Sequence, residues 1–361
     1  MVSSQPHVSI IILNWNGWRD TIECLESVLK SEYENYHVLL VDNCSQDNSP
    51  EKIKDWALDK LEHQIESALP QFVFPLIDKP TPLWELKTDG SRISGEMLKN
   101  DLSAQIPARS IVLVRNHENS GFAAGSNLGI KISDFLFPTE YIFLLNNDAV
   151  IEPQAIRILV DYLSHNKEIG AATSAIYAYT EPQKIANLGG KLTYWGTQSY
   201  FTNSNGQKIR KVSFVTGCAL MVRKNVLDKF GFFSEKFFFG EEDFEFSMRL
   251  RKNNIPMACV AESRVYHKVS ASSEKLYQNI TRKKFIHVFN RVIDMKDYFS
   301  YPVWVAWKWL ILGYSLFWLT VKHRESFSTA RKFVLSLNKY THEFDNARKA
   351  TVEKIYQEIG L

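Results

Sequence analysis

Cysteine is scarce in this chain, and its arrangement excludes two classes of site. The four cysteines, at positions 24, 44, 218 and 259, stand singly and lack the close spacing of a zinc site or a redox pair. We therefore predict reduced thiols in or near the core. Residues 1–7 also lack a basic segment followed by an apolar one, so no secretory signal is predicted and a cytoplasmic location is expected.

An excess of charge of one sign is also missing. The chain has 43 Lys and Arg against 40 Asp and Glu, a net charge of +3, with no long basic run or base-stacking motif, which excludes nucleic acid as a partner. Gly121, Gly125 and Gly129 do not form a GxGxxG pattern, which argues against dinucleotide binding. With 361 residues, 45% of them hydrophobic, the chain can bury a sizeable core in one large domain or two modest ones.

A repeated strand, loop and helix pattern organises the first half. Residues 8–13 and 36–41 are β-rich runs, each followed by a polar turn and by helical spacing, up to residue 30 and from 50 to about 61. Five prolines interrupt residues 64–109, which we interpret as an insertion, before a strand at 111–114, a helix at 121–132 and a strand at 140–145. Repeated βα units predict a mostly parallel sheet, with Asn14, Asp42, Asn116 and Asp148 converging beyond its carboxyl ends.

The second half of the chain has a less regular pattern. We predict that it binds the acceptor, the molecule that receives a group in a transfer reaction. Residues 153–165 are predicted to form a helix and 171–179 a strand, while 187–206 are rich in glycine, asparagine and aromatic residues. Residues 212–222 are predicted to form one strand interrupted at Gly217, where a missing side chain lets a ligand approach. A helix at 242–252 and a strand at 258–267 follow. The candidate acceptor-binding residues are Trp195, Gly217 and Cys218.

Two acidic signatures lie well apart in the chain. Residues 144–148, Leu-Leu-Asn-Asn-Asp, end an apolar run, and residues 240–245, Gly-Glu-Glu-Asp-Phe-Glu, open a helical one. A carboxylate at a strand end can hold a divalent cation against a diphosphate, and one at a helix start can take a proton from a nucleophile. Together they predict metal-assisted group transfer. The alternatives are an ordinary turn after the strand and acidic residues that offset the helix dipole, which we prefer for Glu241 and Glu245.

These segments resemble the family two glycosyltransferases of the GT-A fold, especially their rhamnosyltransferase-like branch. The matches occur in the family's order over roughly residues 8–267: 8–16, 41–47, 119–127, 144–148, and Glu242-Asp243 followed by Arg249-Leu250. The resemblance implies an α/β GT-A fold, Rossmann-like, with helices on both faces of a mostly parallel sheet. It places a catalytic domain at 1–275, with a nucleotide-sugar half at 1–150 that holds the insertion at about 64–109, an acceptor half at 151–275, and a C-terminal helical region at 276–361.

The resemblance also implies donor-side and metal-binding roles. Residues 146–148 resemble the family's DxD motif with Asn146 in place of the first aspartate, so Asp148 is the expected ligand of a Mn or Mg ion. His267 lies where the family supplies a second ligand, although a lone histidine usually has no such role. Asp42 is expected to accept a hydrogen bond from the imide N–H of uracil or thymine. The other donor-side candidates are Asn14, Asp47, which also fits a helix cap, Gly121, Phe122, Asn127, Asn146 and Asn147.

Glu242 and Asp243 resemble the family's catalytic ED pair, in which the aspartate is the base. Asp243 would remove the proton of an acceptor hydroxyl as the anomeric carbon is attacked. The implied activity is inverting transfer of a sugar, by preference rhamnose from dTDP-rhamnose or else a UDP-sugar, to a glycan or lipid-linked acceptor in cell-surface polysaccharide synthesis. The alternatives are a catalytically weak GT-A-like scaffold protein, which the altered Asn146 favours, and a nucleotidyltransferase, which would need a glycine- and lysine-rich loop after the first strand.

The C-terminal region contains an aromatic, apolar run with basic flanks. Residues 303–321 approach the length of a membrane span, but their tryptophans and Lys308, which can snorkel, fit a helix lying in the interface better. Basic residues at 282–291 and 322–332 flank this run. We predict peripheral attachment to the anionic inner face of the cell membrane. The alternative is a helical hairpin that packs on its own domain or on a partner subunit, and the oligomeric state stays open.

Overall fold

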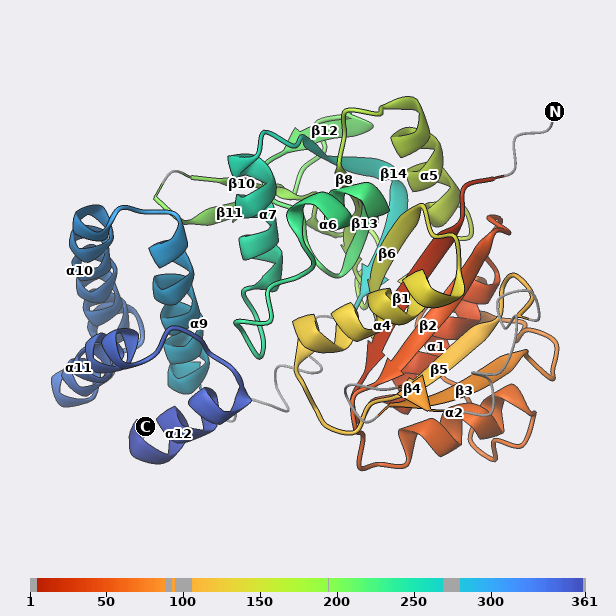
Figure 1. Ribbon diagram of the computed structural model, residues 1–361, viewed down its shortest axis with the longest axis horizontal. Coiled ribbons are helices and arrows are strands. Elements are labelled where there is room, and N and C mark those ends of the chain that lie inside the picture. Colours follow the sequence, from red (N-terminus) through yellow and green to blue (C-terminus); the bar gives the residue numbers. More distant parts are fainter. Residues whose placement is uncertain (1–4, 89–92, 95–105, 194, 269–279, 360–361) are drawn as a thin grey trace.

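A mostly parallel sheet forms the centre of the protein, as predicted (Figure 1). The structure, a computed structural model, describes residues 5–88, 93–94, 106–193, 195–268 and 280–359. Strands β1 (Val8–Asn14), β2 (Tyr36–Asp42), β5 (Ile111–Arg115) and β6 (Tyr141–Asn146) run parallel, in the order β6-β1-β2-β5. Their side chains are almost all buried, as expected for strands covered on both faces.

Two hydrophobic cores lie on opposite faces of this sheet, because successive strand residues point to opposite sides. Ile10 and Ile12 pack with α1 (Trp18–Leu29), α2 (Ser49–Ala57) and α5 (Ala155–His165). Ile11 packs with α4 (Phe122–Leu136), α6 (Lys224–Phe230) and α7 (Glu242–Lys252). The predicted α/β fold with helices on both faces is therefore confirmed, and the four cysteines are free, with three of them buried.

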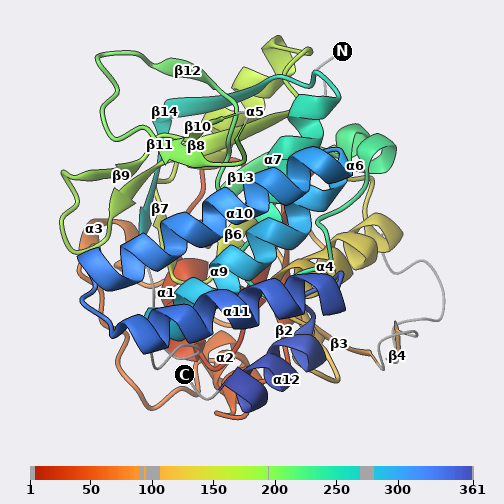
Figure 2. The same ribbon diagram turned by 90° about the vertical axis from the view of Figure 1, so that its left-hand side faces the viewer.

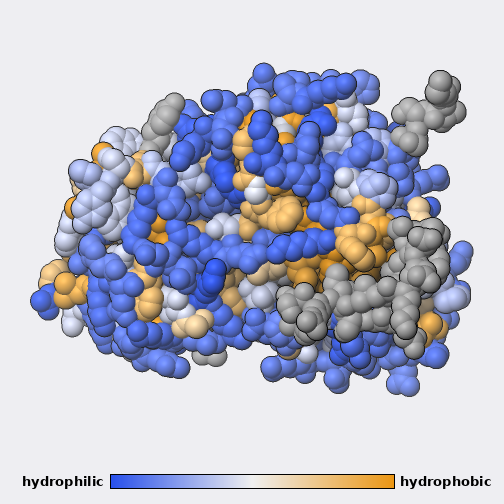
Figure 3. Space-filling view, in the orientation of Figure 1, coloured by the Kyte–Doolittle hydropathy of each residue, from blue (hydrophilic) through white to orange (hydrophobic). Residues whose placement is uncertain are grey.

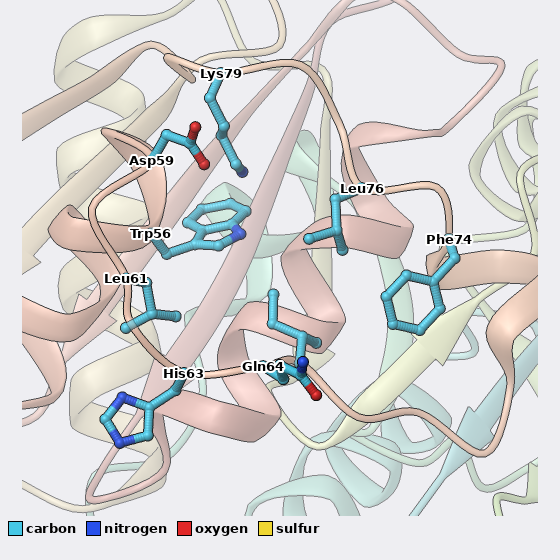
Figure 4. A pocket seen from close by; sticks show the side chains of 9 residues that line it. Trp56, Asp59, Leu61, His63, Gln64, Phe74, Leu76 and Lys79 are labelled. Carbon is cyan, nitrogen blue, oxygen red and sulfur yellow. The ribbon is translucent and has the colours of Figure 1, made fainter.

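The proline-rich insertion adds a strand that the sequence did not indicate. It contains α3 (Pro70–Val73), β3 (Leu83–Thr88) and β4 (Ile93–Ser94), and β3 pairs in parallel with β5. A cavity of about 450 Å³ lies between this segment and the end of α2, and Figure 4 shows the side chains that line it. There Lys79 Nζ lies 3.5 Å from the ring centroid of Trp56 and 3.3 Å from Glu26 Oε1. The described part of the insertion is therefore held against α1 and α2.

The predicted single strand at 212–222 is wrong. Instead β12 (Ile209–Val212) pairs with β14 (Met257–His267), whereas β13 (Ala219–Arg223) runs antiparallel between β6 and β8 (Ala171–Ala178). The residues between β12 and β13 form a loop that carries Gly217. The remaining strands of this half are β7 (Ala149–Ile151), β9 (Ile185–Asn187), β10 (Gly190–Leu192) and β11 (Gln198–Tyr200).

Four α-helices among the described residues of the C-terminal region share a third core. They are α9 (Ile280–Asp294), α10 (Tyr301–Phe317, continued by a π-helical turn at Trp318–Lys322), α11 (Phe327–Glu343) and α12 (Lys349–Ile359). Figure 2 shows α9, α10 and α11 side by side at one end of the molecule. The snorkelling predicted for Lys308 is wrong: it is 1% exposed, and its Nζ lies 2.8 Å from Asn338 Oδ1 and 2.7 Å from His342 Nε2 of α11.

Candidate active site

The carboxyl ends of β1 and β2 meet, as the strand pattern predicted. Asn14 is opposite Asp42 in the parallel register and donates from Nδ2 to Asp42 Oδ1 over 2.7 Å. Ser45 N donates to the other oxygen over 3.0 Å, and Thr21 Oγ1 donates to Asn14 Oδ1 over 2.8 Å. Burial raises the pKa of Asp42, which is 2% exposed. Each carboxylate oxygen has a second lone pair, so the predicted hydrogen bond to a base stays a prediction.

Sheet pairing brings the two predicted metal ligands together. β7 pairs with the end of β14, with Ala149 opposite His267, and His267 Nε2 lies 2.9 Å from Asp148 Oδ1. Burial acts to raise the pKa of Asp148, but the histidine outweighs it and holds this pKa below its usual value. Burial acts to lower the pKa of His267, but Cys218 and Asp148 outweigh it and hold this pKa well above its usual value.

The residues around Asp148 fit a divalent cation. Within the ranges that the structure describes, no group of three His, Cys, Asp or Glu side chains gathers, so amide oxygen has to complete the donor set. Asn146 is the candidate for this oxygen, because its Oδ1 is buried without a hydrogen-bond partner and its Nδ2 lies 3.1 Å from His267 Nε2. In an octahedron with bonds of about 2.1 Å, adjacent ligands lie about 3 Å apart. The 2.9 Å between Asp148 and His267 matches that spacing.

The loop before β13 joins the two acidic motifs. The backbone N–H of Gly217 donates to the Asp243 carboxylate, and a Cβ added at Gly217 would lie 3.9 Å from Asp243 Cβ. The next residue, Cys218, hydrogen-bonds His267 through its thiol and accepts from Asn146 N over 2.9 Å through its carbonyl. Two consecutive residues therefore contact the predicted base on one side and the predicted metal ligands on the other.

Asp243 forms no ion pair among the described contacts, whereas Glu241 and Glu245 each pair with an arginine. It lies half-buried in the first turn of α7, and burial together with the charge of Glu242 raises its pKa to about 7. Glu242 Oε2 instead accepts from the backbone N–H groups of Gly240 and Glu241, over 2.7 and 2.9 Å. The acidic run thus contains one residue suited to proton transfer and one that holds the loop.

Glu241 forms a buried ion pair with Arg291, whose guanidinium lies 3.3 Å from the ring centroid of Phe244. Arg291 was predicted to be part of a basic flank beside a membrane helix. That prediction is wrong, because α9 places this arginine between the acidic run and the β10–β11 hairpin, where it also donates to Gln198 Oε1 over 2.7 Å. The sequence could not show this contact, since the partners lie on separate elements.

Several predicted donor-side residues hold the loops of the site. Gly121 has a φ of +86°, and an added Cβ would lie 2.3 Å from Phe238 O, so only glycine fits there. Phe122 N donates to the same carbonyl over 3.1 Å, and the ring of Phe122 lies beside Gly217. Asn147 Nδ2 donates to Thr21 Oγ1 over 2.9 Å. These contacts show that Gly121, Phe122 and Asn147 position the loops of the site. Their predicted contacts with the donor stay a prediction.

Three other candidates lie in structural or peripheral positions. The amide of Asn127 bonds both the N–H and the carbonyl of Phe233, so it fixes the loop after α6. Asp47 accepts from Ser49 N over 3.0 Å just before α2, but the N-cap residue of this helix is Asn48, which makes no side-chain cap hydrogen bond. Trp195, one of the acceptor candidates, is 66% exposed, and its carbonyl accepts from Trp307 Nε1 over 2.7 Å.

Sequence reasoning missed Trp15, His117 and Phe238, which line a cavity beyond the ends of β1, β2 and β5. Trp15 follows the first strand directly, and that position was a usable signal. It also missed Lys268, whose Nζ lies 2.6 Å from Asp20 Oδ1 and whose N–H donates to Asp148 O over 3.1 Å. A basic residue after His267 was visible in the sequence, but its partners were not.

Comparisons with known proteins agree with this fold and site. The family model "Glycosyltransferase like family 2" matches residues 96–285, and "Glycosyl transferase family 2" matches residues 9–66. The chain therefore belongs to glycosyltransferase family 2. It is 24% identical over 255 residues to the low-salt glycan biosynthesis hexosyltransferase Agl10 of Haloferax volcanii, covering 63% of this chain and 80% of that protein.

The fold is also seen in a solved structure, that of GalNAc-T7. GalNAc-T7 with UDP, GalNAc and Mn²⁺ aligns with 99% of this chain at a TM-score of 0.54 and 14% identity, and the chain spans 58% of the length of that protein. Residues 1–349 of S. aureus TarS align with 92% of this chain and 79% of that one, at a TM-score of 0.48 and 12% identity. The fold is GT-A, and the rhamnosyltransferase-like branch stays a prediction.

Proposed function

We propose that the protein is an inverting glycosyltransferase that moves a sugar from a nucleoside diphosphate to a hydroxyl group of a glycan or lipid-linked acceptor. The observation that carries the proposal is the loop at 217–218, which contacts Asp243 on one side and the Asp148–His267 pair on the other. An in-line displacement needs a proton acceptor and a diphosphate site across one sugar-sized gap. The glycan-biosynthesis role in the name of the Haloferax relative supports the acceptor class.

In this mechanism the chain's own residues do three things. Asp243 accepts the proton of the acceptor hydroxyl as that oxygen bonds to the anomeric carbon and the bond from this carbon to the diphosphate breaks. Asp148, His267 and Asn146 would hold a divalent cation, Mn or Mg, which supplies Lewis-acid neutralisation of the diphosphate charge when bound. Gly217 leaves room for the sugar, because it has no side chain between Phe122 and Asp243.

The identity of the donor is proposed from the family resemblance and from a solved structure of similar fold. The rhamnosyltransferase-like branch favours dTDP-rhamnose, whereas GalNAc-T7 was solved with UDP, GalNAc and Mn²⁺, which supports a UDP-sugar and a cation. Thymine, the base of dTDP, and uracil, the base of UDP, both carry the imide N–H that Asp42 is proposed to recognise. Cell-surface polysaccharide synthesis is the proposed setting.

A panel of nucleotide sugars, with Mn²⁺ and with EDTA, tests the function. We expect one dTDP- or UDP-sugar to raise the melting temperature by several degrees in Mn²⁺, and this shift to shrink in EDTA, because only the folded state binds the pair. The same sugar should be hydrolysed slowly without acceptor. A protein that binds vesicles but neither binds nor hydrolyses any nucleotide sugar would instead be the GT-A-like scaffold.

We also propose that α10 and α11 attach the protein to the anionic inner face of a cell membrane. Among the described helices, Tyr301–Lys322 is long and apolar enough to cross a membrane, with 33% of its most apolar window buried. The buried contacts of Lys308 favour a helix that packs on α11 and lies in the interface. Leu310, Phe317 and Val321 are exposed along one side of it, and Lys322 and Arg324 follow, a pairing that fits acidic lipid. Figure 3 shows hydrophobic (orange) and intermediate (pale) residues beside hydrophilic (blue) ones at the left-hand end of the molecule, where α10 and α11 lie.

Replacing Leu310 and Phe317 by glutamate should reduce binding to vesicles that contain phosphatidylserine by roughly tenfold or more, because two apolar side chains lose their insertion energy and two negative charges are added. Co-sedimentation with vesicles measures it. Phe135→Glu is the matched control, since Phe135 is 65% exposed on α4, far along the chain from the helical region. Equal binding by all three proteins would remove α10 from the attachment.

A further inference from the structure

A cavity of about 400 Å³ lies beyond the carboxyl ends of β1, β2 and β5. The loops after these strands form one wall, with Trp15 and His117 among the lining residues, and Phe238 contributes from the loop before α7. The opposite wall is α12, through Val352, Glu353 and neighbouring residues. Two parts of the chain at opposite ends of the sequence therefore enclose one space.

The cavity suits a flat heteroaromatic group. Its volume lies in the range of about 300–1,000 Å³ that small-molecule sites occupy. Open α/β sheets bind ligands beyond their carboxyl strand ends, and the half-buried indole of Trp15 and the imidazole of His117 offer flat faces on which a base can stack. Cys44 and Gln46, which line the cavity, belong to the turn that begins at Asp42, the residue proposed to bind the base, so the nucleoside is the part of the donor assigned to this cavity.

The helix α12 is fixed in this position from both sides. Ala347, just before it, accepts from Phe238 N and donates to Lys236 O, each over 2.8 Å, in a bridge to the loop before α7. Tyr340 of α11 donates to Glu358 Oε2 over 2.7 Å, on the other side of the helix. The wall is thus built into the fold and does not depend on a free tail.

The same loop joins the cavity to the catalytic side. The carbonyl of Phe238 accepts from Phe122 N over 3.1 Å, while its side chain lines the cavity. Asp243 follows a few residues later at the start of α7. A ligand held between Trp15 and α12 therefore contacts the loop that leads to the predicted base.

We propose that α12 is the outer wall of the donor's nucleoside pocket, and that the C-terminal helix sets donor affinity and the choice of base. The inference rests on the proposed function, because it assigns the nucleoside of that donor to this cavity. Lys349, Val352, Glu353 and Tyr356 are spaced by three and four residues, so they lie on one face of α12 and present it to the loops of the sheet.

The variant Glu353→Trp tests the proposal, because it places a large ring on the lining face at an exposed position of the helix. In the full-length protein with Mn²⁺, we expect the Kd for UDP or dTDP to rise by about 10- to 100-fold, the cost of forcing a larger side chain into the space that the base would fill. The Kd for inorganic pyrophosphate should not change, since pyrophosphate has no base. Gln357→Trp, an exposed position on the same helix that does not line the cavity, should bind all three ligands as the unmodified protein does.

The outcomes separate the two proposals. If the unmodified protein binds UDP or dTDP and transfers a sugar while Glu353→Trp binds them equally well, α12 is not the wall and the proposed function stands. Equal loss of pyrophosphate and nucleotide, or equal loss in Gln357→Trp, would mean a general disturbance of the fold and would also overturn the assignment. If the unmodified protein binds neither nucleoside diphosphate, both proposals fall.

Discussion

Asp243→Asn should reduce sugar transfer by about 10²- to 10⁴-fold, the usual contribution of a positioned general base. The asparagine has nearly the same shape and can still accept the N–H of Gly217 through its amide oxygen, but it cannot take a proton from the acceptor. Donor binding should stay within about twofold, since the carboxylate contacts Gly217 and not the Asp148–His267 pair. Initial rates and calorimetry with the donor measure the two effects.

The control is Glu245→Gln, which removes a carboxylate from the same helix at a position where it bonds Arg249 over 2.8 Å. This variant should keep most of its activity. Unchanged transfer by Asp243→Asn would remove Asp243 from the mechanism, and an equal loss in both variants would assign the effect to α7 as a whole.

The pH dependence gives a second readout of the same residue. Burial and Glu242 raise the pKa of Asp243 to about 7, and a base works only when it is unprotonated. The rate should therefore fall about tenfold per pH unit below pH 7 and level off above it. In Asp243→Asn the remaining activity should lose this acid limb. A profile that is flat from pH 5 to 8 in the unmodified protein would contradict the role.

The elements that the sequence predicted well are those with strong local signals. The helix at 242–252 has the predicted bounds, because three acidic residues in its first turn and three basic ones in its last oppose the helix dipole. Strands β1 and β2, which end at Asn14 and Asp42, are continuous apolar runs. The strand at 83–88 was missed because prolines surround it, and its place at the sheet edge depends on β5, far away in the sequence.

Contacts between distant segments explain the other differences. Lys308 and Arg291 look like solvated charges next to an apolar run, but their partners, Asn338 and Glu241, lie on other elements. The order of the family motifs anticipated that Asp148 and His267 belong together, and β7–β14 pairing brings them to 2.9 Å. Nothing in the local pattern at 217–218 indicated that two residues would join both motifs, nor that a C-terminal helix would line a cavity of the sheet.

Asp148→Ala should weaken Mn²⁺-dependent binding of the donor at least ~100-fold, because changes to residues that only support metal ligands already cost 10- to 100-fold in metal affinity. Binding in EDTA should be weak in both proteins and no weaker in the variant, since without the cation the carboxylate only repels the diphosphate. Calorimetry with UDP or dTDP, in Mn²⁺ and in EDTA, measures this difference.

Asp148→Asn separates metal binding from packing. The amide keeps the side-chain volume and can still hydrogen-bond His267, so the fold should be retained, but a neutral oxygen is a poorer ligand for a hard cation. If Asp148→Asn binds donor in Mn²⁺ as tightly as the unmodified protein, the carboxylate is not a metal ligand and its 2.9 Å contact with His267 is structural. If it loses the Mn²⁺ dependence while pyrophosphate binding falls in parallel, the loss lies at the diphosphate and not at the base, because pyrophosphate and donor share only that group.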